Sequence, residues 1–267
     1  MATDGAVREP ATINCVEDIL LKFDRTGGPQ ARRWALYRGL RCFGYTLTPT
    51  LFRLDPTKCS LRGVPSIGGM PWDRIESELL TEFKHEAISY FRTPIVTEIE
   101  LRMLAQHYGL PTRLLDWSKN PLVALYFACE CENDNRDAAF VVCSQTFATV
   151  PDPTTTTWEQ LRHFNYAAVS PPRFDARLIA QSGWFTTHAL PAGTEPFVPV
   201  DQAIDGLFLP EKRRIPADRK GPIKLQLEFL GVDHSTIYPG LDGIGRNLKW
   251  ASEVRHKSAH PLNIAGT

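Results

Sequence analysis

The sequence predicts an α+β fold for this chain of 267 residues. Apolar residues recur at helical spacing in several stretches before residue 132, and most of the patterns typical of strands come later. No internal repeat, Gly-x-Gly-x-x-Gly motif or Walker loop is present, which disfavours a standard dinucleotide-binding fold and an ATPase. Helices in the first part of the chain and strands in the later part favour an α+β arrangement.

The first ninety residues predict two helices, a strand and a long loop. Residues 14–24 have the apolar spacing of a helix, and the glycines and proline that follow stop it. Residues 34–40 alternate apolar and polar side chains and predict a strand that ends in a Gly turn. Residues 53–72 are rich in Pro, Gly and Ser and predict a loop. Helical patterning returns over residues 73–91, with acidic side chains toward its start.

The centre of the chain predicts two more helices and two strands. Thr97 opens a helix with a capping box, and Gly109 stops it. Asn120 caps the second helix, whose first residue is a proline. Residues 113–117 predict a short strand, and residues 138–143 predict a buried one.

The last part of the chain is less regular. Thr and Pro dominate residues 149–157 and predict a linker. Residues 170–220 have many prolines and little periodicity, which predicts short strands joined by loops. Residues 223–229 alternate cleanly and predict a strand. Residues 233–251 predict a last helix, and the segment 251–267 is expected to be a tail.

Composition excludes several classes of protein. The 30 Lys and Arg residues balance 30 Asp and Glu residues, which excludes a wholly basic nucleic-acid coat but not a local basic groove. The longest apolar run, Leu122–Cys129, is far shorter than the roughly 18 residues of a membrane span. No signal peptide is visible, and the six cysteines lack the spacing of a metal site. We therefore expect a cytoplasmic protein with free thiols, no membrane partner and no metal.

The tripeptide Tyr37-Arg38-Gly39 is the first candidate for ligand contact. It places an arginine at the end of the predicted strand, followed by a glycine. The guanidinium has fixed donors, and a glycine lets a ligand approach the backbone closely, which suits a phosphate or a ribose. The alternative is that Arg38 is an ordinary surface arginine.

The second candidate is the tract at residues 106–128, which is rich in polar side chains of several types. His107, Arg113, Asp116 and Ser118 lie within twelve residues, at a junction of helix, turn, strand and helix. Polar side chains gather around ligands at such junctions. The alternative is structural, with His107 at a helix dipole, Asp116 as a cap and Arg113 as its salt-bridge partner.

Two later motifs add less. Residues 177–185 contain Gln181, whose amide can bind another amide or a base edge, followed by Gly183 and Phe185. The alternative there is a strand and a turn with an incidental glutamine. Residues 238–243 predict a turn that opens the last helix.

Together, these motifs resemble the FRG domain family, which is named for its aromatic-Arg-Gly motif. The resemblance rests on the stretches at 37–39, 106–128, 177–185 and 236–248. It spans residues 30–250 and leaves an N-terminal helical segment at 1–29 and the tail outside. This chain has Tyr where the name-giving motif has Phe.

The chain is also similar to arginine-type ADP-ribosyltransferases. In these enzymes an arginine on the first strand holds NAD, and a strand ending in Ser precedes a Pro-x-x-Ala-x-x-Phe-Ala helix. Arg38 and residues 118–128 match these elements. The similarity implies a split mixed or antiparallel sheet with helices packed around it. The strand expected to carry the catalytic Glu, residues 174–181, has Gln181 but no Glu, so either another acid such as Asp116 serves, or the site binds without that chemistry.

The similarity implies an enzyme that cleaves NAD and transfers ADP-ribose to a nucleic-acid or protein acceptor, as a toxin or phage-defence effector with an antitoxin partner. Loss of nicotinamide develops an oxocarbenium ion that a carboxylate stabilises, and the acceptor needs a base. The expected catalytic residues are His107, Asp116 and Gln181. The expected NAD-binding residues are Tyr37, Arg38, Gly39, Arg113, Trp117 and Ser118.

Two alternatives stay open. A nucleotide- or nucleic-acid-binding module without catalysis would use Arg38, Arg113 and the basic stretch at 212–214, and its affinity would depend steeply on salt. A different hydrolase or transferase would use His107 and Asp116 without NAD. The sequence predicts neither the acceptor nor an oligomeric state.

Overall fold

The computed structural model describes residues 11–19, 35–61, 64–65, 69–90, 97–143, 157, 166–172, 175–203 and 210–258. The strands are β1 Leu36–Leu40, β2 Ser60–Leu61, β3 Val64–Pro65, β4 Leu114–Ser118, β5 Ala138–Cys143, β6 Tyr166–Val169, β7 Gly183–His188 and β8 Glu211–Ile215. The α-helices are α3 Trp72–Ala87, α4 Glu98–His107, α5 Pro121–Cys129, α7 Ala176–Ala180, α8 Lys220–Phe229, α9 His234–Ile237 and α10 Leu241–Ser258. Short 3-10 helices cover Thr50–Arg53, Ile88–Tyr90 and Ala217–Arg219.

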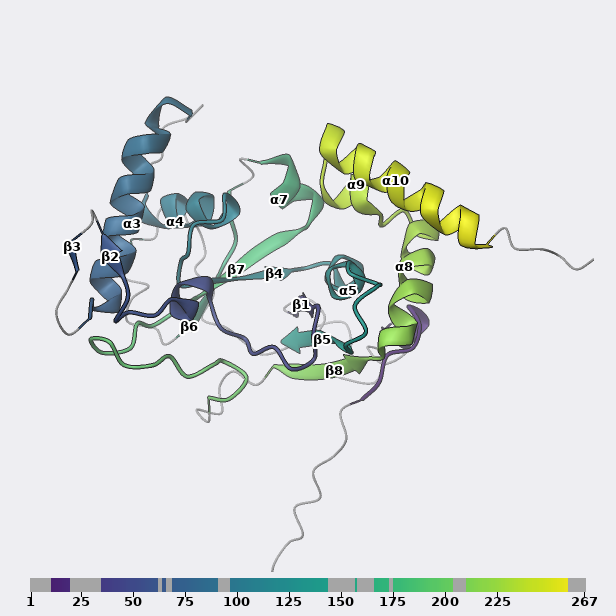
Figure 1. The fold of residues 1–267 in the computed structure, drawn as a ribbon, viewed down its shortest axis with the longest axis horizontal. Helices are drawn as coiled ribbons and strands as arrows, with labels where there is room; N and C mark the ends of the chain where they lie inside the picture. The colour runs from purple at the N-terminus through teal and green to yellow at the C-terminus, as the bar shows by residue number, and fades with distance from the viewer. Residues whose placement is uncertain are drawn as a thin grey trace, which may run out of the picture.

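The predicted α+β class is confirmed. Six strands form an antiparallel sheet in the order β6-β7-β4-β1-β5-β8, and β2 and β3 form a separate hairpin. In Figure 1, α3 and α4 lie at one end of the molecule and α8, α9 and α10 at the other, with the sheet and α5 between them. None of the helices within the described ranges is both long and apolar enough to cross a membrane.

Helices pack against one face of the sheet, and loop residues pack against the other. On one face, α5 packs against β1 and β5, and α8 packs behind it, through side chains such as Tyr37, Phe140 and Leu227. On the same face, α4 and α7 pack against β4 and β7. Loop residues, including Leu47 and Val200, cover the other face. The two helical groups on the first face are separated at the junction of β1 and β4.

Local signals in the sequence predicted several boundaries correctly. The Thr97 hydroxyl accepts from the Glu100 amide at 3.2 Å, and the Glu100 carboxylate accepts from the Thr97 amide at 3.0 Å. Gly109 has a φ of +87°, a left-handed conformation that ends α4 at little cost for glycine. The Asn120 side chain accepts from the Leu122 amide at 2.9 Å and opens α5. The strands predicted at 113–117 and 138–143 are β4 and β5.

Two predicted strands are helices. The alternating segment 223–229 lies in α8, because Ile223 and Leu227, four residues apart, are both fully buried against the α5 side of the core. The strand predicted at 174–181 is the short helix α7, because Asp175 accepts from the Arg177 amide at 2.7 Å and caps a helical turn.

Other expectations are met in part. Of the predicted helix at 14–24, residues 17–19 are helical, residues 14–16 are not, and residues 20–24 lie outside the described residues, as does the linker at 149–157 except for Thr157. The expected tail is helical as far as Ser258, where α10 ends. All six cysteines are free.

Candidate functional site

The sheet opens between its two central strands. β1 pairs with β5 along its whole length but with β4 only through Tyr37 and Ser118. Beyond that pair the two strands separate, and the Asp116 carbonyl accepts a hydrogen bond from Nη1 of Arg38 in place of a strand neighbour. The Arg38 side chain therefore fills the gap between β1 and β4.

Helix α5 closes over β1 on one side of this gap, and Gly39 makes the approach possible. A Cβ atom at Gly39 would lie 2.0 Å from the Ala124 carbonyl oxygen and 2.4 Å from the Ala128 amide nitrogen. Only glycine fits such a contact, because real Cβ atoms do not come within 3.0 Å of backbone. The glycine of Tyr-Arg-Gly is thus explained by packing against the backbone of α5.

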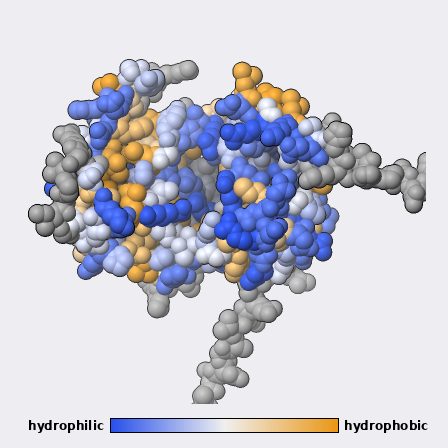
Figure 2. Space-filling view, viewed as in Figure 1, coloured by the Kyte–Doolittle hydropathy of each residue, from blue (hydrophilic) through white to orange (hydrophobic). Residues whose placement is uncertain are grey.

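A pocket of about 340 Å³ lies over the gap, between α4 and α7 on one side and α5 on the other. The surface in Figure 2 is hollowed near its centre, between the side of α4 and the side of α8. Of the nine site residues predicted from the sequence, eight line this pocket: Tyr37, Arg38, Gly39, His107, Asp116, Trp117, Ser118 and Gln181. The structure therefore brings the two main motifs together in one site.

The Arg38 guanidinium is loosely paired and keeps one donor without a partner among the described residues. Its Nη1 lies 3.7 Å from Oδ2 of Asp116, and its buried Nε has no hydrogen-bond partner among the described residues. Burial lowers the pKa of Arg38, and the Asp116 carboxylate opposes that shift. A buried donor without a partner is costly unless a ligand or water supplies an acceptor.

Asp116 projects into the pocket with 53% of its side chain exposed. Its Oδ2 accepts from Nε2 of Gln106 at 2.9 Å. The Gln106 amide is held in turn, because its Oε1 accepts from the Thr112 hydroxyl at 2.7 Å. This chain of hydrogen bonds fixes the orientation of a carboxylate that still faces solvent.

His107 ends α4 and lies against α7. Its Nε2 is 3.3 Å from Oδ1 of Asp175, and its side chain is only 10% exposed. Burial lowers the pKa of His107, so the ring is neutral near pH 7. A neutral ring whose Nε2–H donates to Asp175 carries its lone pair on Nδ1, which is the arrangement of an oriented base.

Three predicted site residues line the pocket but are held by structural contacts. The Ser118 hydroxyl donates to the Gln181 carbonyl at 2.7 Å and accepts from the Asn120 amide. The indole of Trp117 packs in the core of the opposite face, where its Nε1 donates to Thr186. The Gln181 amide donates to the carbonyl of Ile237 at 3.2 Å. Their side chains position the walls of the pocket.

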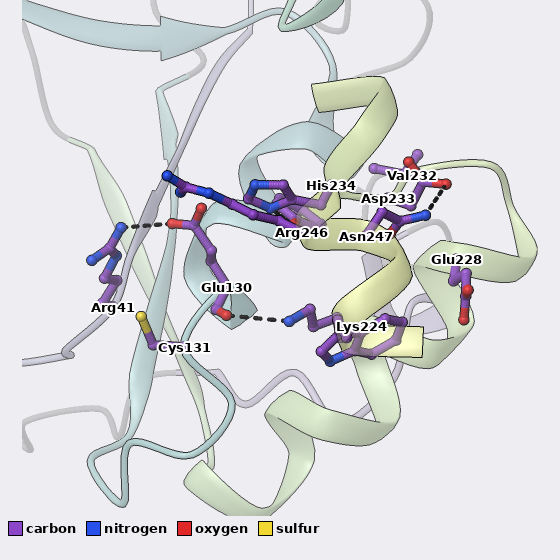
Figure 3. A pocket seen from close by; sticks show the side chains of 12 residues that line it. Arg41, Glu130, Cys131, Lys224, Glu228, Val232, Asp233, His234, Arg246 and Asn247 are labelled. Atoms are coloured by element: carbon purple, nitrogen blue, oxygen red, sulfur yellow. Dashed lines mark hydrogen bonds and ion pairs between the residues drawn. The ribbon is translucent and has the colours of Figure 1, made fainter. Parts of the chain in front are cut away.

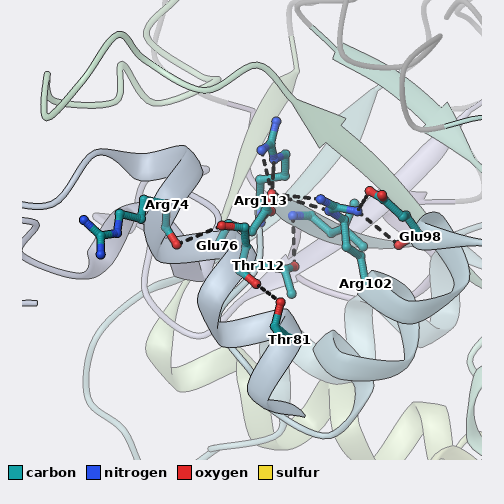
Figure 4. Close-up of polar contacts among 9 residues, drawn as sticks. Arg74, Glu76, Thr81, Glu98, Arg102, Thr112 and Arg113 are labelled. Carbon is teal, nitrogen blue, oxygen red and sulfur yellow. Dashed lines mark hydrogen bonds and ion pairs between the residues drawn. The ribbon is translucent and has the colours of Figure 1, made fainter. Parts of the chain in front are cut away.

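Arg113, predicted to bind NAD, lies away from the pocket. Figure 4 shows it between α3 and α4, where its Nη2 is 2.5 Å from Oε2 of Glu76. Arg102 contacts the same carboxylate at 3.4 Å. All three side chains are buried. Arg113 thus has the structural role of a salt-bridge partner, although its partner is Glu76 and not Asp116.

The basic stretch predicted for a nucleic-acid-binding module is neutralised within the fold. Lys212 lies 3.6 Å from Asp201, Arg213 lies 2.8 Å from Glu211, and Arg214 lies 2.6 Å from Asp137. Because each cation has an acid beside it, the stretch offers little net charge to a phosphate backbone.

Other residues of the pocket were not predicted from the sequence. Arg41 donates to the Glu130 carboxylate at 2.6 Å, and Tyr238 donates to the same carboxylate at 2.8 Å. Arg177 lies over the ring of Tyr238, 4.7 Å from its centroid. Phe127 adds an aromatic wall from α5. The position of Arg41 three residues after Arg38, and of Glu130 directly after α5, was the available signal.

One protein family matches part of the chain. Residues 33–137 match the FRG domain. This segment holds both main motifs of the sequence, from Tyr37 to the end of α5. No curated protein and no solved structure matches the chain.

The FRG segment does not complete the pocket alone. Arg177, Leu178, Gln181, Phe185 and Tyr238 also line it, and all of them follow residue 137. The motifs at 177–185 and 236–248, which lie outside the match, therefore close the pocket that the FRG segment opens. No group of three or more His, Cys, Asp or Glu side chains within the described ranges is placed to hold a metal.

Proposed function

We propose that this chain with an FRG domain is an ADP-ribosyltransferase-like enzyme, which cleaves NAD and transfers ADP-ribose to a nucleic-acid or protein acceptor. The observation that carries the proposal is the Arg38 guanidinium in the gap between β1 and β4. It has an unpartnered buried Nε among the described residues and stands beside the exposed Asp116 carboxylate. A cation for phosphate and an anion for an oxocarbenium ion thus stand side by side.

The architecture adds support. The similarity to arginine-type ADP-ribosyltransferases implies a sheet split beside the arginine strand, and here a single residue pair joins β1 to β4. The helix that follows Ser118 lies over Gly39, next to the arginine. A pocket of about 340 Å³ is at the lower end of the range for small-molecule sites and takes the reacting half of a dinucleotide.

In the proposed reaction, the bond between ribose C1′ and the nicotinamide nitrogen breaks, and nicotinamide leaves with the electron pair. Arg38 and Arg177 hold the phosphate groups, and Arg177 takes the role that the sequence assigned to Arg113. Asp116 stabilises the positive charge that develops on the ribose. The acceptor attacks C1′, and its proton passes to Nδ1 of His107, which Asp175 orients.

Asp116 is the carboxylate best suited to this role. Glu228, the only Glu in the segment 220–229, lines a neighbouring cavity and not this pocket. Glu130 lines the pocket, but Arg41 and Tyr238 already occupy its oxygens. Asp116 is fixed by Gln106 and still exposed, so a positive centre can approach it.

The test is nicotinamide release, followed by chromatography with protein, DNA and RNA as acceptors. We expect release by the wild type, and loss of release in Arg38→Ala with an unchanged melting temperature. Arg74→Ala, which removes an exposed arginine from α3, is the matched control and should retain activity. Absence of both NAD binding and nicotinamide release would refute the proposal. NAD binding without release would instead support a binding module.

A further inference from the structure

A second cavity adjoins the FRG pocket. It measures about 310 Å³ and lies between the end of α5 and helices α8, α9 and α10. Arg41 and Glu130 line both cavities, so their ion pair forms a shared wall. Figure 3 shows this wall facing the side chains of α9 and α10.

Asn247 lines this cavity and carries a hydrogen-bond acceptor that no described residue uses. Its Nδ2 donates to Oδ2 of Asp233 at 3.3 Å. Because an ionised carboxylate only accepts, this contact fixes the orientation of the amide and turns Oδ1 away from Asp233. That Oδ1 is buried and has no hydrogen-bond partner among the described residues. A buried acceptor of this kind needs an N–H or O–H donor.

The rest of the cavity combines an aromatic wall with cations. Trp250 supplies the wall; its Nε1 is held by the Glu132 carboxylate, and Nζ of Lys224 lies 4.6 Å from its ring centroid. Arg246 extends from α10 past His234 in the direction of Arg41 and Glu130 (Figure 3). The carboxylates of Glu228 and Asp233 also line the cavity, which disfavours an anion there outside the end near Arg41 and Arg246.

We propose that this second cavity binds the adenylate half of the dinucleotide, an inference that rests on the proposed function. The exocyclic amino group of adenine donates to Oδ1 of Asn247, and the base packs against Trp250. The phosphate of the adenylate half lies at the shared wall beside Arg41 and Arg246, and the second phosphate lies beyond this wall, beside Arg38 and Arg177. The nicotinamide ribose then lies at Arg38 and Asp116, in the adjoining pocket.

The first experiment needs no variant. Isothermal titration of the full chain with AMP and with IMP compares a base that carries the amino group with one that has a carbonyl oxygen in its place. We expect AMP to bind at least about tenfold more tightly, because the carbonyl of IMP leaves Oδ1 of Asn247 without a donor. Equal affinities for the two nucleotides, or no binding of AMP, would overturn the inference.

Variants then separate the two cavities. Asn247→Leu should lose most AMP affinity and keep its affinity for nicotinamide mononucleotide, whereas Arg38→Ala should do the reverse. Ser252→Leu changes an exposed residue of the same helix outside the cavity and is the matched control. If AMP is preferred to IMP but NAD is never cleaved, the adenylate site survives and the proposed reaction fails. If NAD is cleaved and Asn247→Leu leaves its KM unchanged, the reaction survives and the adenylate site fails.

Discussion

Two arginines near β4 each face a carboxylate, but one pair has a structural role and the other belongs to the candidate site. Arg113, directly before the strand, is buried and shares the Glu76 carboxylate with Arg102. Arg38, across the gap from the strand, faces a carboxylate that is half exposed. The protein itself neutralises the Arg113 guanidinium. At Arg38 it leaves the buried Nε without an acceptor among the described residues, so a ligand can supply one.

The difference lies in what surrounds each pair. Burial alone would raise the pKa of Glu76, but the guanidiniums of Arg113 and Arg102 hold it below its usual range. Both arginines are held between α3, α4 and the start of β4, so this cluster fixes helix positions. The Arg38 pair lies where two strands separate, and separation creates the space that a ligand needs. We call the buried cluster of Glu76, Arg102 and Arg113 the closed cluster, and it has a structural role. We call Arg38 and Asp116 the open pair, and it belongs to the candidate site, the open site.

The strongest test of the closed cluster is Glu76→Gln. A neutral amide removes the buried carboxylate that Arg113 and Arg102 share, so we expect a loss of about 3–5 kcal/mol of folding free energy. Urea denaturation would measure it. Glu78→Gln, two residues along the same helix, removes a carboxylate from an exposed pair with Arg74 and should cost at most about 0.5 kcal/mol. Equal effects of the two substitutions would contradict the contrast.

Asp116→Asn tests the open pair. Because the carboxylate is exposed, we expect folding stability to change by no more than about 0.5 kcal/mol. The rate of nicotinamide release should fall about 100-fold or more, since a preorganised anion is lost from the transition state. The fall should appear in kcat, with little change in KM. Asp218→Asn alters another exposed Asp 3.7 Å from an arginine and should leave kcat intact. A drop in stability without a drop in kcat would make Asp116 a structural residue.

Gly39→Ala tests the packing of α5 against β1, on one side of the gap that Arg38 fills. The added Cβ meets the backbone of α5 at Ala124 and Ala128, which side-chain movement cannot relieve. We expect a loss of about 1–3 kcal/mol in thermal or urea denaturation. Gly44→Ala meets only the Cys42 sulfur at 3.8 Å and should be close to neutral. A stable Gly39→Ala protein would mean that α5 can shift away from β1.

The sequence predicted much of the candidate site because its main residues lie in consecutive short elements. The caps at Thr97 and Asn120 and the stop at Gly109 are local signals, and they set α4, β4 and α5 in order. Asp116 and Ser118 are two residues apart on β4, so they lie on the same face of the sheet as Leu114. That is the face against which α4 packs, and His107 ends α4.

The rest depended on contacts between distant parts of the chain. The partner of Arg113 is Glu76, 37 residues earlier, and nothing near Arg113 in the sequence indicates it. The alternation in α8 imitates a strand, and only packing against α5 decides for a helix. Arg41, Glu130 and Tyr238 directly follow three separate elements, β1, α5 and α9, and tertiary structure alone makes them neighbours.

The pH dependence of activity gives the finest distinction, because His107 is an imidazole of the open site. Burial lowers the pKa of His107 below its ordinary value, and Asp175 partly restores it. Since the neutral ring is the base, kcat/KM should be level above about pH 6.5 and fall as the pH drops through the lowered pKa. Protonation also favours the unfolded chain, whose histidine pKa is ordinary, so stability falls in the same direction.

Asp175→Asn separates this mechanism from general acid sensitivity. Asparagine still caps α7 but removes the charge that raises the pKa of His107. The acid limb of kcat/KM should therefore move to lower pH in this variant. His85→Asn, an exposed histidine of α3, should leave the profile unchanged. An acid limb that stays in place, or that moves to higher pH, would show that His107 is not the titrating base and that the open site has another proton acceptor.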